Sequence, residues 1–157
     1  MTAGIPKQRG LGLKITVFAP LMKVDAVRSD TLTDREDVLE LVQTGAIAWS
    51  LNIGLGEKRS ELRLLAKSVS GYLATGVRCN LEGETKDRVV AYILSKESKP
   101  EISARRLAFL FCCERKLIVS LIEAGELTEV GNRHRGNAGR TLITRVSVEK
   151  FLKRRMR

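Results

Sequence analysis

The segment from Ser103 to Gly125 constrains the fold most, because it predicts two short helices joined by a tight turn. Ser103 can cap the first helix, a break falls near Cys112, and the second helix ends before Gly125. The second helix carries apolar residues at helical spacing on one side. These residues are Leu117, Ile118, Leu121 and Ile122.

The residues that follow predict a hairpin and a last helix. Segments 126–130 and 141–144 are strand-like, and they flank a turn-rich loop over 131–140 that contains no acidic residue. A final helix from Ser147 to about Arg154 buries one apolar face. The residues on that face are Val148, Phe151 and Leu152.

Four segments within residues 102–152 stand in the order and spacing of a known DNA-binding motif. They are 102–110, 115–122, 123–127 and 143–152. Together they resemble the winged helix-turn-helix of the excisionase and MerR-type DNA-binding families. In that resemblance the four segments correspond to the first helix, the recognition helix, the Ser-Gly-x-Leu exit, and the closing strand and helix. It covers about a third of the chain and implies binding to double-stranded DNA.

The chain departs from the family pattern at two positions of the turn. Cys112 stands where these families usually have glycine, and Glu114 stands where they usually have a serine or threonine cap. A carboxylate near DNA phosphates repels them, although negative charge at a helix N-terminus also favours the helix dipole.

The outward face of the second helix carries the residues that we expect to contact DNA. A major groove about 12 Å wide accepts one helix whose outer face carries hydrogen-bond donors. Arg115 and Lys116 could reach guanine edges or phosphates, Ser120 a phosphate or a base, and Val119 a thymine methyl. An ordinary amphipathic surface helix explains the apolar stripe equally well, but not the order of helix-turn-helix, hairpin and helix.

The loop over 131–140 is the second candidate contact. Its arginines stand among small residues that would let the loop tip enter a narrow, negative minor groove, and His134 adds a possible contact. The alternative is a solvated loop without a partner. The tail over 153–157 would add phosphate contacts that carry no sequence information. The full set of predicted DNA-binding residues is Arg105, Arg106, Arg115, Lys116, Val119, Ser120, Arg133, His134, Arg135, Arg140, Arg145 and Lys153.

The front of the chain predicts a small module of helices and a strand. Thr33 and Glu36 form the pattern of a capping box that starts a helix ending at Gly45. Residues 1–20 show no sustained period, which indicates a flexible basic arm, with a short strand at 13–18. The remaining expected elements are a strand over 46–53, a helix over 57–74 on the spacing of Leu62, Leu65, Val69 and Leu73, and a helix over 84–95.

The front also parallels the back of the chain at an offset of 80 residues. Residues 41–47 (LVQTGAI) correspond to 121–127 (LIEAGEL), and Tyr72-Leu73 corresponds to Phe151-Leu152 at nearly the same offset. Two tandem winged modules would follow, but coincidence is as good an explanation as duplication. In a true repeat the front helix would be acidic and better suited to packing or a protein partner. Its charged residues are Asp34, Arg35, Glu36, Asp37 and Glu40.

The net charge of +10 favours a polyanionic partner. Residues 101–157 carry +7 and residues 1–100 carry +3, so most of the excess lies with the predicted DNA-binding segment. Nucleic acid is the first inference, an anionic membrane surface a weaker one, and a solvated basic face the alternative. Aromatic residues are only 4%, which disfavours a stacking platform for single strands.

Other classes of protein lack support in the sequence. No segment reaches the roughly 20 apolar residues of a membrane helix, and we find no nucleotide-binding, hydrolase or metalloprotease motif. Cys79, Cys112 and Cys113 form a poor disulfide framework and follow no metal-binding spacing. We therefore expect a cytoplasmic protein that is not an enzyme and that uses no cofactor, metal or small-molecule substrate.

The sequence thus predicts an α+β, mostly helical chain. Residues 1–20 form a basic arm, 21–98 a small α/β module, and 99–157 a winged helix-turn-helix with a basic tail. We expect sequence-specific binding of duplex DNA by a transcriptional regulator or an excisionase-like recombination factor. The alternative is a protein-interaction or assembly module, and residues 33–95 could in either case form a homodimer or bind a protein partner.

Overall fold

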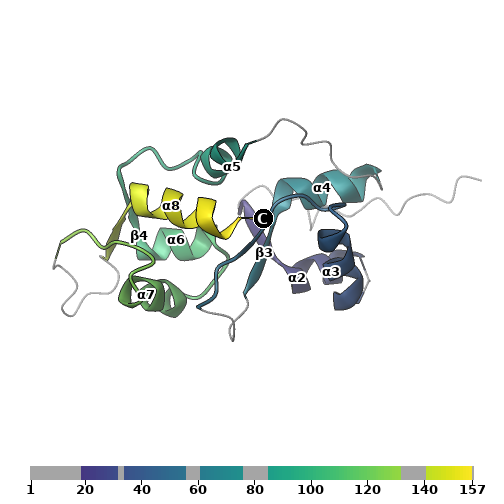
Figure 1. The fold of residues 1–157 in the computed structure, drawn as a ribbon, viewed down its shortest axis with the longest axis horizontal. Coiled ribbons are helices and arrows are strands. Elements are labelled where there is room, and N and C mark those ends of the chain that lie inside the picture. The colour runs from purple at the N-terminus through teal and green to yellow at the C-terminus, as the bar shows by residue number, and fades with distance from the viewer. Residues whose placement is uncertain (1–18, 32–33, 56–60, 76–84, 132–140, 157) are drawn as a thin grey trace, which may run out of the picture.

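A computed structural model describes residues 19–31, 34–55, 61–75, 85–131 and 141–156, and within them the chain forms seven helices and two small antiparallel sheets (Figure 1). This is the α+β class that the sequence predicts. The elements are β1 (Leu21–Lys23), α2 (Val24–Thr31), α3 (Arg35–Gln43), β2 (Ser50–Asn52), β3 (Leu62–Leu65), α4 (Ala66–Thr75), α5 (Lys86–Ile93), β4 (Glu101–Ser103), α6 (Ala104–Leu110), α7 (Arg115–Glu123), β5 (Leu142–Thr144) and α8 (Arg145–Arg155).

The elements β1 to α4 form an N-terminal unit around a three-stranded sheet. The strand order is β1-β3-β2, and β3 pairs antiparallel with both neighbours. Helix α3 begins after Asp34, whose backbone N–H donates to the Asp37 carboxylate at 3.4 Å. The cap therefore lies one residue after the predicted Thr33, which is outside the described residues. Gly45 follows α3 with a φ of 77°, as predicted for its end.

Two predicted elements of this unit are wrong in part. Residues 62–65 form strand β3, so the helix expected over 57–74 begins only at Ala66. The strand expected over 46–53 is limited to 50–52. Leu62 and Leu65 fit a helical spacing, but their backbone groups pair with β2 and β1, which the local pattern does not reveal. The strand predicted at 13–18 lies outside the described residues.

The elements β4 to α8 form a C-terminal unit. Strand β5 pairs with β4 along one edge, in register Ile102↔Ile143. Along its other edge, the Thr144 N–H donates to the Thr128 carbonyl at 2.9 Å, and the Val130 N–H donates to the Leu142 carbonyl at 2.8 Å. The backbone pairing between residues 128–130 and 142–144 that the predicted hairpin requires is therefore present. The two-stranded sheet itself consists of β5 and β4.

The two units are built on the same plan. Each residue of α3 has its counterpart 80 positions later in α7, and Gly45 and Gly125 both follow these helices with a φ of 77°. After the loops the offset becomes 79. The Pro20 carbonyl accepts from Ala66 N–H at 2.9 Å, and the Pro100 carbonyl accepts from Arg145 N–H at 2.8 Å. Equivalent core residues are Met22 and Ile102, Val38 and Ile118, Ile47 and Leu127, Leu64 and Ile143, and Val69 and Val148.

The sheet of the N-terminal unit is buried on both faces. Leu64 of β3 packs in the core of its own unit, whereas Leu65 belongs to a larger core that includes the C-terminal unit. Because side chains alternate along a strand, the same sheet contacts α2 to α4 on one side and the C-terminal unit on the other. Leu51 and Ile53 extend the second contact.

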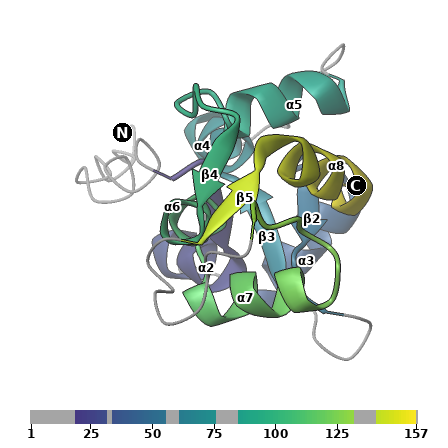
Figure 2. The ribbon, with the colours of Figure 1, turned by 90° about the vertical axis from the view of Figure 1, so that its left-hand side faces the viewer.

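The segment between the units and the end of the chain join this larger core. Helix α5 contributes Val89, Val90 and Ile93, and it lies beside α8 (Figures 1 and 2). Met156, directly after α8, forms an antiparallel bridge with Leu51 of β2. The domain boundary between residues 98 and 99 stays a prediction. Helix α5 precedes this boundary in the sequence, but it packs against α8 of the C-terminal unit.

Candidate nucleic-acid interface

Helices α6 and α7 are joined by a short turn, as the local sequence pattern predicts. The Ser103 hydroxyl oxygen accepts from the Arg106 N–H at 3.1 Å, which confirms the predicted cap of α6. Cys112 has a φ of 50°, so the predicted break lies at this residue. Glu114 occupies the N-cap position of α7 with an extended backbone and without a side-chain cap hydrogen bond. The turn is therefore tight, and the start of α7 has no capping side chain.

Helix α7 has one buried and one exposed face. Ile118 and Leu121 are fully buried, while Arg115 and Lys116 are exposed at the N-terminal end. Figures 1 and 2 show α7 on the outer side of the C-terminal unit, away from α5. Neither cation has an ion-pair partner among the described residues, so both are free to meet an external anion.

The middle of this exposed face is less available than the sequence suggests. Val119 and Ser120 are half-buried. The Ser120 hydroxyl donates to the carbonyl of Lys116 at 3.0 Å, within the same helix. Ser120 can still accept a hydrogen bond, but donation to a phosphate requires this internal bond to break.

Two of the predicted DNA-contact residues, Arg106 and Arg145, bind Glu97. Arg106 forms an ion pair with the Glu97 carboxylate, and its guanidinium lies 5.0 Å from the centre of the Phe109 ring. Arg145 donates to the Glu97 carbonyl and forms a second ion pair with Glu149 at 3.0 Å. Both arginines are thus engaged within the protein.

The remaining predicted contact residues fall in three places. Arg105 is exposed on α6. Lys153 lies on α8 with its ammonium 2.5 Å from the Asp87 carboxylate, and the hydrogen bond to Asp87 raises the pKa of Lys153 above its ordinary value. The others lie outside the described residues: Arg133, His134, Arg135 and Arg140.

The structure also shows residues that sequence reasoning missed. Lys86 and Arg88 on α5 and Lys150 on α8 are exposed cations on helices that pack together. The Lys86 ammonium donates to the Lys153 carbonyl at 3.4 Å, which places the start of α5 beside the end of α8. The helical pattern of α5 could have identified Arg88, because Val89, Val90 and Ile93 mark the opposite, buried side. Lys86 shares the face of these three residues and is exposed at the first turn of the helix.

A second missed residue is Arg63, whose side chain is only 4 % exposed. It stands in a strand otherwise composed of leucines. One cation in such a run is a signal for a buried, fully bonded charge, since an unpaired buried charge is costly. The helical interpretation of residues 57–74 concealed this signal.

The cysteines of the turn are free thiols. Burial raises the pKa of Cys113 from 9.0 to about 12, so this thiol stays protonated and poorly nucleophilic near neutral pH. Cys112 is half-buried beside it. Within the described residues, no group of three or more histidine, cysteine or acidic side chains is placed to hold a metal ion.

The chain matches no protein-family model, no curated protein and no solved structure. Among the helices of the described segments, every one is too short or too polar to cross a lipid bilayer.

Proposed function

We propose that this chain binds double-stranded DNA with its C-terminal unit acting as a winged helix-turn-helix. The observation that carries the proposal is the exposed start of α7, where Arg115 and Lys116 lie without an acidic partner among the described residues. The α6 helix, the tight turn at Cys112 and the strand ladder beside β5 accompany α7 in the order expected of that motif. A transcriptional regulator or an excisionase-like accessory factor is the corresponding class of protein.

In this proposal α7 enters the major groove with its N-terminal end first. Arg115 can form two hydrogen bonds with the O6 and N7 atoms of guanine, and Lys116 can neutralise a phosphate. In the same proposal the arginines of residues 131–140 would reach the adjacent minor groove. Arg105 would add a backbone contact. Arg106, Arg145 and Lys153 would first have to leave their partners at Glu97, Glu149 and Asp87.

Fluorescence anisotropy with labelled duplex DNA tests this proposal. We expect binding that weakens with salt, with log K falling by about 0.9 per log unit of salt for each phosphate contacted. Replacing Arg115 and Lys116 with glutamate should abolish binding. The matched control is Arg35→Glu, which reverses an exposed arginine at the equivalent position of α3. Equal losses in both variants, or no binding by the unmodified protein at low salt, would refute the proposal.

A protein partner is the second candidate function, and the surface of α3 favours it. Glu36, Asp37 and Glu40 are all exposed on this helix, which would repel phosphate. The test is sedimentation velocity of the unmodified chain and of a variant with lysine at these three positions. A self-association that the variant loses would support an interaction through α3, and identical sedimentation would exclude self-association through this face.

A further inference from the structure

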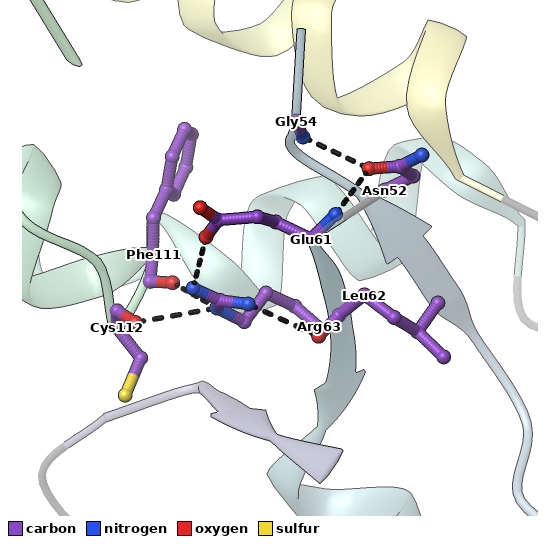
Figure 3. Close-up of polar contacts among 7 residues, drawn as sticks. All are labelled: Asn52, Gly54, Glu61, Leu62, Arg63, Phe111 and Cys112. Carbon is purple, nitrogen blue, oxygen red and sulfur yellow. Dashed lines mark hydrogen bonds and ion pairs between the residues drawn. The ribbon is translucent and has the colours of Figure 1, made fainter. Parts of the chain in front are cut away.

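The side chain of Arg63 crosses from the N-terminal unit to the α6–α7 turn of the C-terminal unit (Figure 3). Its Nε atom donates to the Phe111 carbonyl at 2.9 Å and to the Cys112 carbonyl at 3.2 Å. These acceptors lie 48 and 49 positions further along the chain. A residue of β3 thus binds the backbone at the point where α6 ends.

The other donors of this guanidinium are bonded within the N-terminal unit. One Nη donates to the Leu62 carbonyl at 3.1 Å, and the second forms an ion pair with the Glu61 carboxylate at 2.8 Å. Glu61 is itself tied to β2, because its N–H donates to the Asn52 side chain at 2.9 Å. Each of the three guanidinium nitrogens thus has an acceptor, and a buried charge is costly without such partners. We call Arg63, with Glu61, Phe111 and Cys112, the Arg63 clamp.

The clamp acts on the residue of the turn with the least favourable backbone. Cys112 has a φ of 50°, a left-handed conformation that a side chain makes costly and that glycine adopts freely. Such conformations persist where surrounding contacts over-determine them. Within the C-terminal unit, the Cys112 N–H donates to the Phe109 carbonyl at 3.1 Å and the Cys113 N–H to the Ala108 carbonyl at 3.0 Å. Arg63 supplies the contact from outside the unit.

We propose that Arg63 is a positioning residue that holds the α6–α7 turn and thereby sets the direction of the exposed N-terminal end of α7. Helix α7 begins at Arg115, three positions after Cys112, so a change at the turn moves the proposed contact residues directly. In this inference, which rests on the proposed function of α7, the N-terminal unit contributes to DNA recognition by supporting the turn. No DNA contact of its own is required.

Hydrogen exchange tests the clamp without DNA. The variant Arg63→Lys keeps the charge beside Glu61 but loses the planar fork that reaches two carbonyls. The matched control is Arg155→Lys, because Arg155 also joins the units through a bond to a carbonyl, that of Gly54 at 3.0 Å, but away from the turn. We expect exchange of the Cys112, Cys113 and Leu117 amides to accelerate about tenfold or more in the first variant and to stay near the original rate in the control.

Two results of this measurement would overturn the proposal. Unchanged exchange at the turn in Arg63→Lys would show that the clamp does not hold it. An equal acceleration at the Met156 amide, whose N–H donates to the Leu152 carbonyl at 3.0 Å, would show a general loss of stability and a merely structural role.

A glycine at position 112 provides a rescue experiment. Because glycine adopts a positive φ without steric cost, Cys112→Gly should make the turn less dependent on Arg63. We expect Arg63→Lys to accelerate exchange at the turn much less in this background than in the original protein. The same acceleration in both backgrounds would show that Arg63 does not act through the conformation of Cys112.

Binding to DNA then separates this inference from the proposed function. On a duplex selected from random sequences, Arg63→Lys should lower affinity about tenfold, while affinity for a scrambled duplex stays nearly constant, because phosphate contacts tolerate a less ordered α7. If the unmodified protein binds no duplex, the proposed function fails and the exchange data still decide whether the clamp exists. If it binds and Arg63→Lys keeps full discrimination, the positioning role fails while the proposed function stands.

Discussion

Helices α3 and α7 occupy equivalent places in two units of the same plan, but they differ in the surface that they present. Val38 and Ile118 are both fully buried at matching positions. On the exposed side, Glu36 of α3 corresponds to Lys116 of α7, and Glu40 corresponds to Ser120. The buried positions thus keep their apolar character, while two of the outward positions differ in charge and the first, Arg35 in α3 and Arg115 in α7, keeps it. Packing constrains the first set strongly, whereas the exposed set is free to serve different partners.

The largest expected difference between the units concerns their last helices. Phe151 of α8 is fully buried and stacks on Phe111 with ring centroids 5.8 Å apart, whereas its counterpart Tyr72 is half-buried. We expect Phe151→Ala to lower the free energy of unfolding by about 3–5 kcal/mol, and Tyr72→Ala by clearly less. Urea denaturation followed by circular dichroism measures both. Similar losses would contradict our view that the larger core lies with the C-terminal unit.

A second comparison should give equal effects. Gly45 and Gly125 share a φ of 77°, and a Cβ at Gly125 would meet no atom within 4 Å. We therefore expect Gly125→Ala to cost about 1–2 kcal/mol through backbone conformation alone. Gly45→Ala should cost the same in urea denaturation. A marked inequality would show that the two helix ends are not equivalent.

Exchanging charges between the equivalent helices tests the difference in surface. Lys116→Glu gives α7 the charge of α3, and we expect it to weaken duplex binding about tenfold and to reduce the salt slope by about one unit. Glu36→Lys makes the opposite change on α3 and should raise affinity slightly and without sequence preference. Anisotropy titrations at two salt concentrations measure both. A tenfold gain in affinity from Glu36→Lys would indicate that α3 contacts the DNA. It would contradict the proposal that α7 is the contacting helix.

The smallest expected effect lies at the helix starts. Glu114 caps α7 without a side-chain hydrogen bond, whereas at the start of α3 the Asp34 N–H donates to the Asp37 carboxylate. We expect Glu114→Ser to stabilise the protein by about 0.5–1 kcal/mol, because serine can accept from the first free amides of α7. Asp37→Ala, which removes the carboxylate that accepts from the Asp34 N–H, should destabilise it by a similar amount. Thermal denaturation is sensitive enough, and a loss of stability in Glu114→Ser would show that its charge outweighs a cap.

Local signals predicted the helix ends well. Ser103, Gly45 and Gly125 act through hydrogen bonds and backbone angles of their immediate neighbours, so sequence alone identifies them. The inward stripe of α7 and its outward cations followed from helical periodicity in the same way. The offset of 80 residues also came from the sequence, although it could not decide between duplication and coincidence.

Long-range contacts could not be predicted in this way. The error at β3 arose because Leu62 and Leu65 fit a helix, while their hydrogen-bond partners lie on strands that are distant in the sequence. The Arg63 clamp joins residues 48 positions apart and has no local signature beyond one charge among leucines. The pairing of Arg106 with Glu97 likewise depends on tertiary structure. The prediction from sequence that Arg106 contacts DNA therefore did not take this ion pair into account.

The bridge between Met156 and Leu51 has a consequence for synthesis of the chain. Strand β2 is made early, but the backbone that covers its edge is made only when the ribosome has passed residue 155. Until then Leu51 and Ile53 lack their C-terminal packing partners, and an uncovered strand edge invites pairing with other nascent chains. We therefore expect ribosome-bound chains that end near residue 98 to depend on chaperones, and release of the full chain to end that dependence.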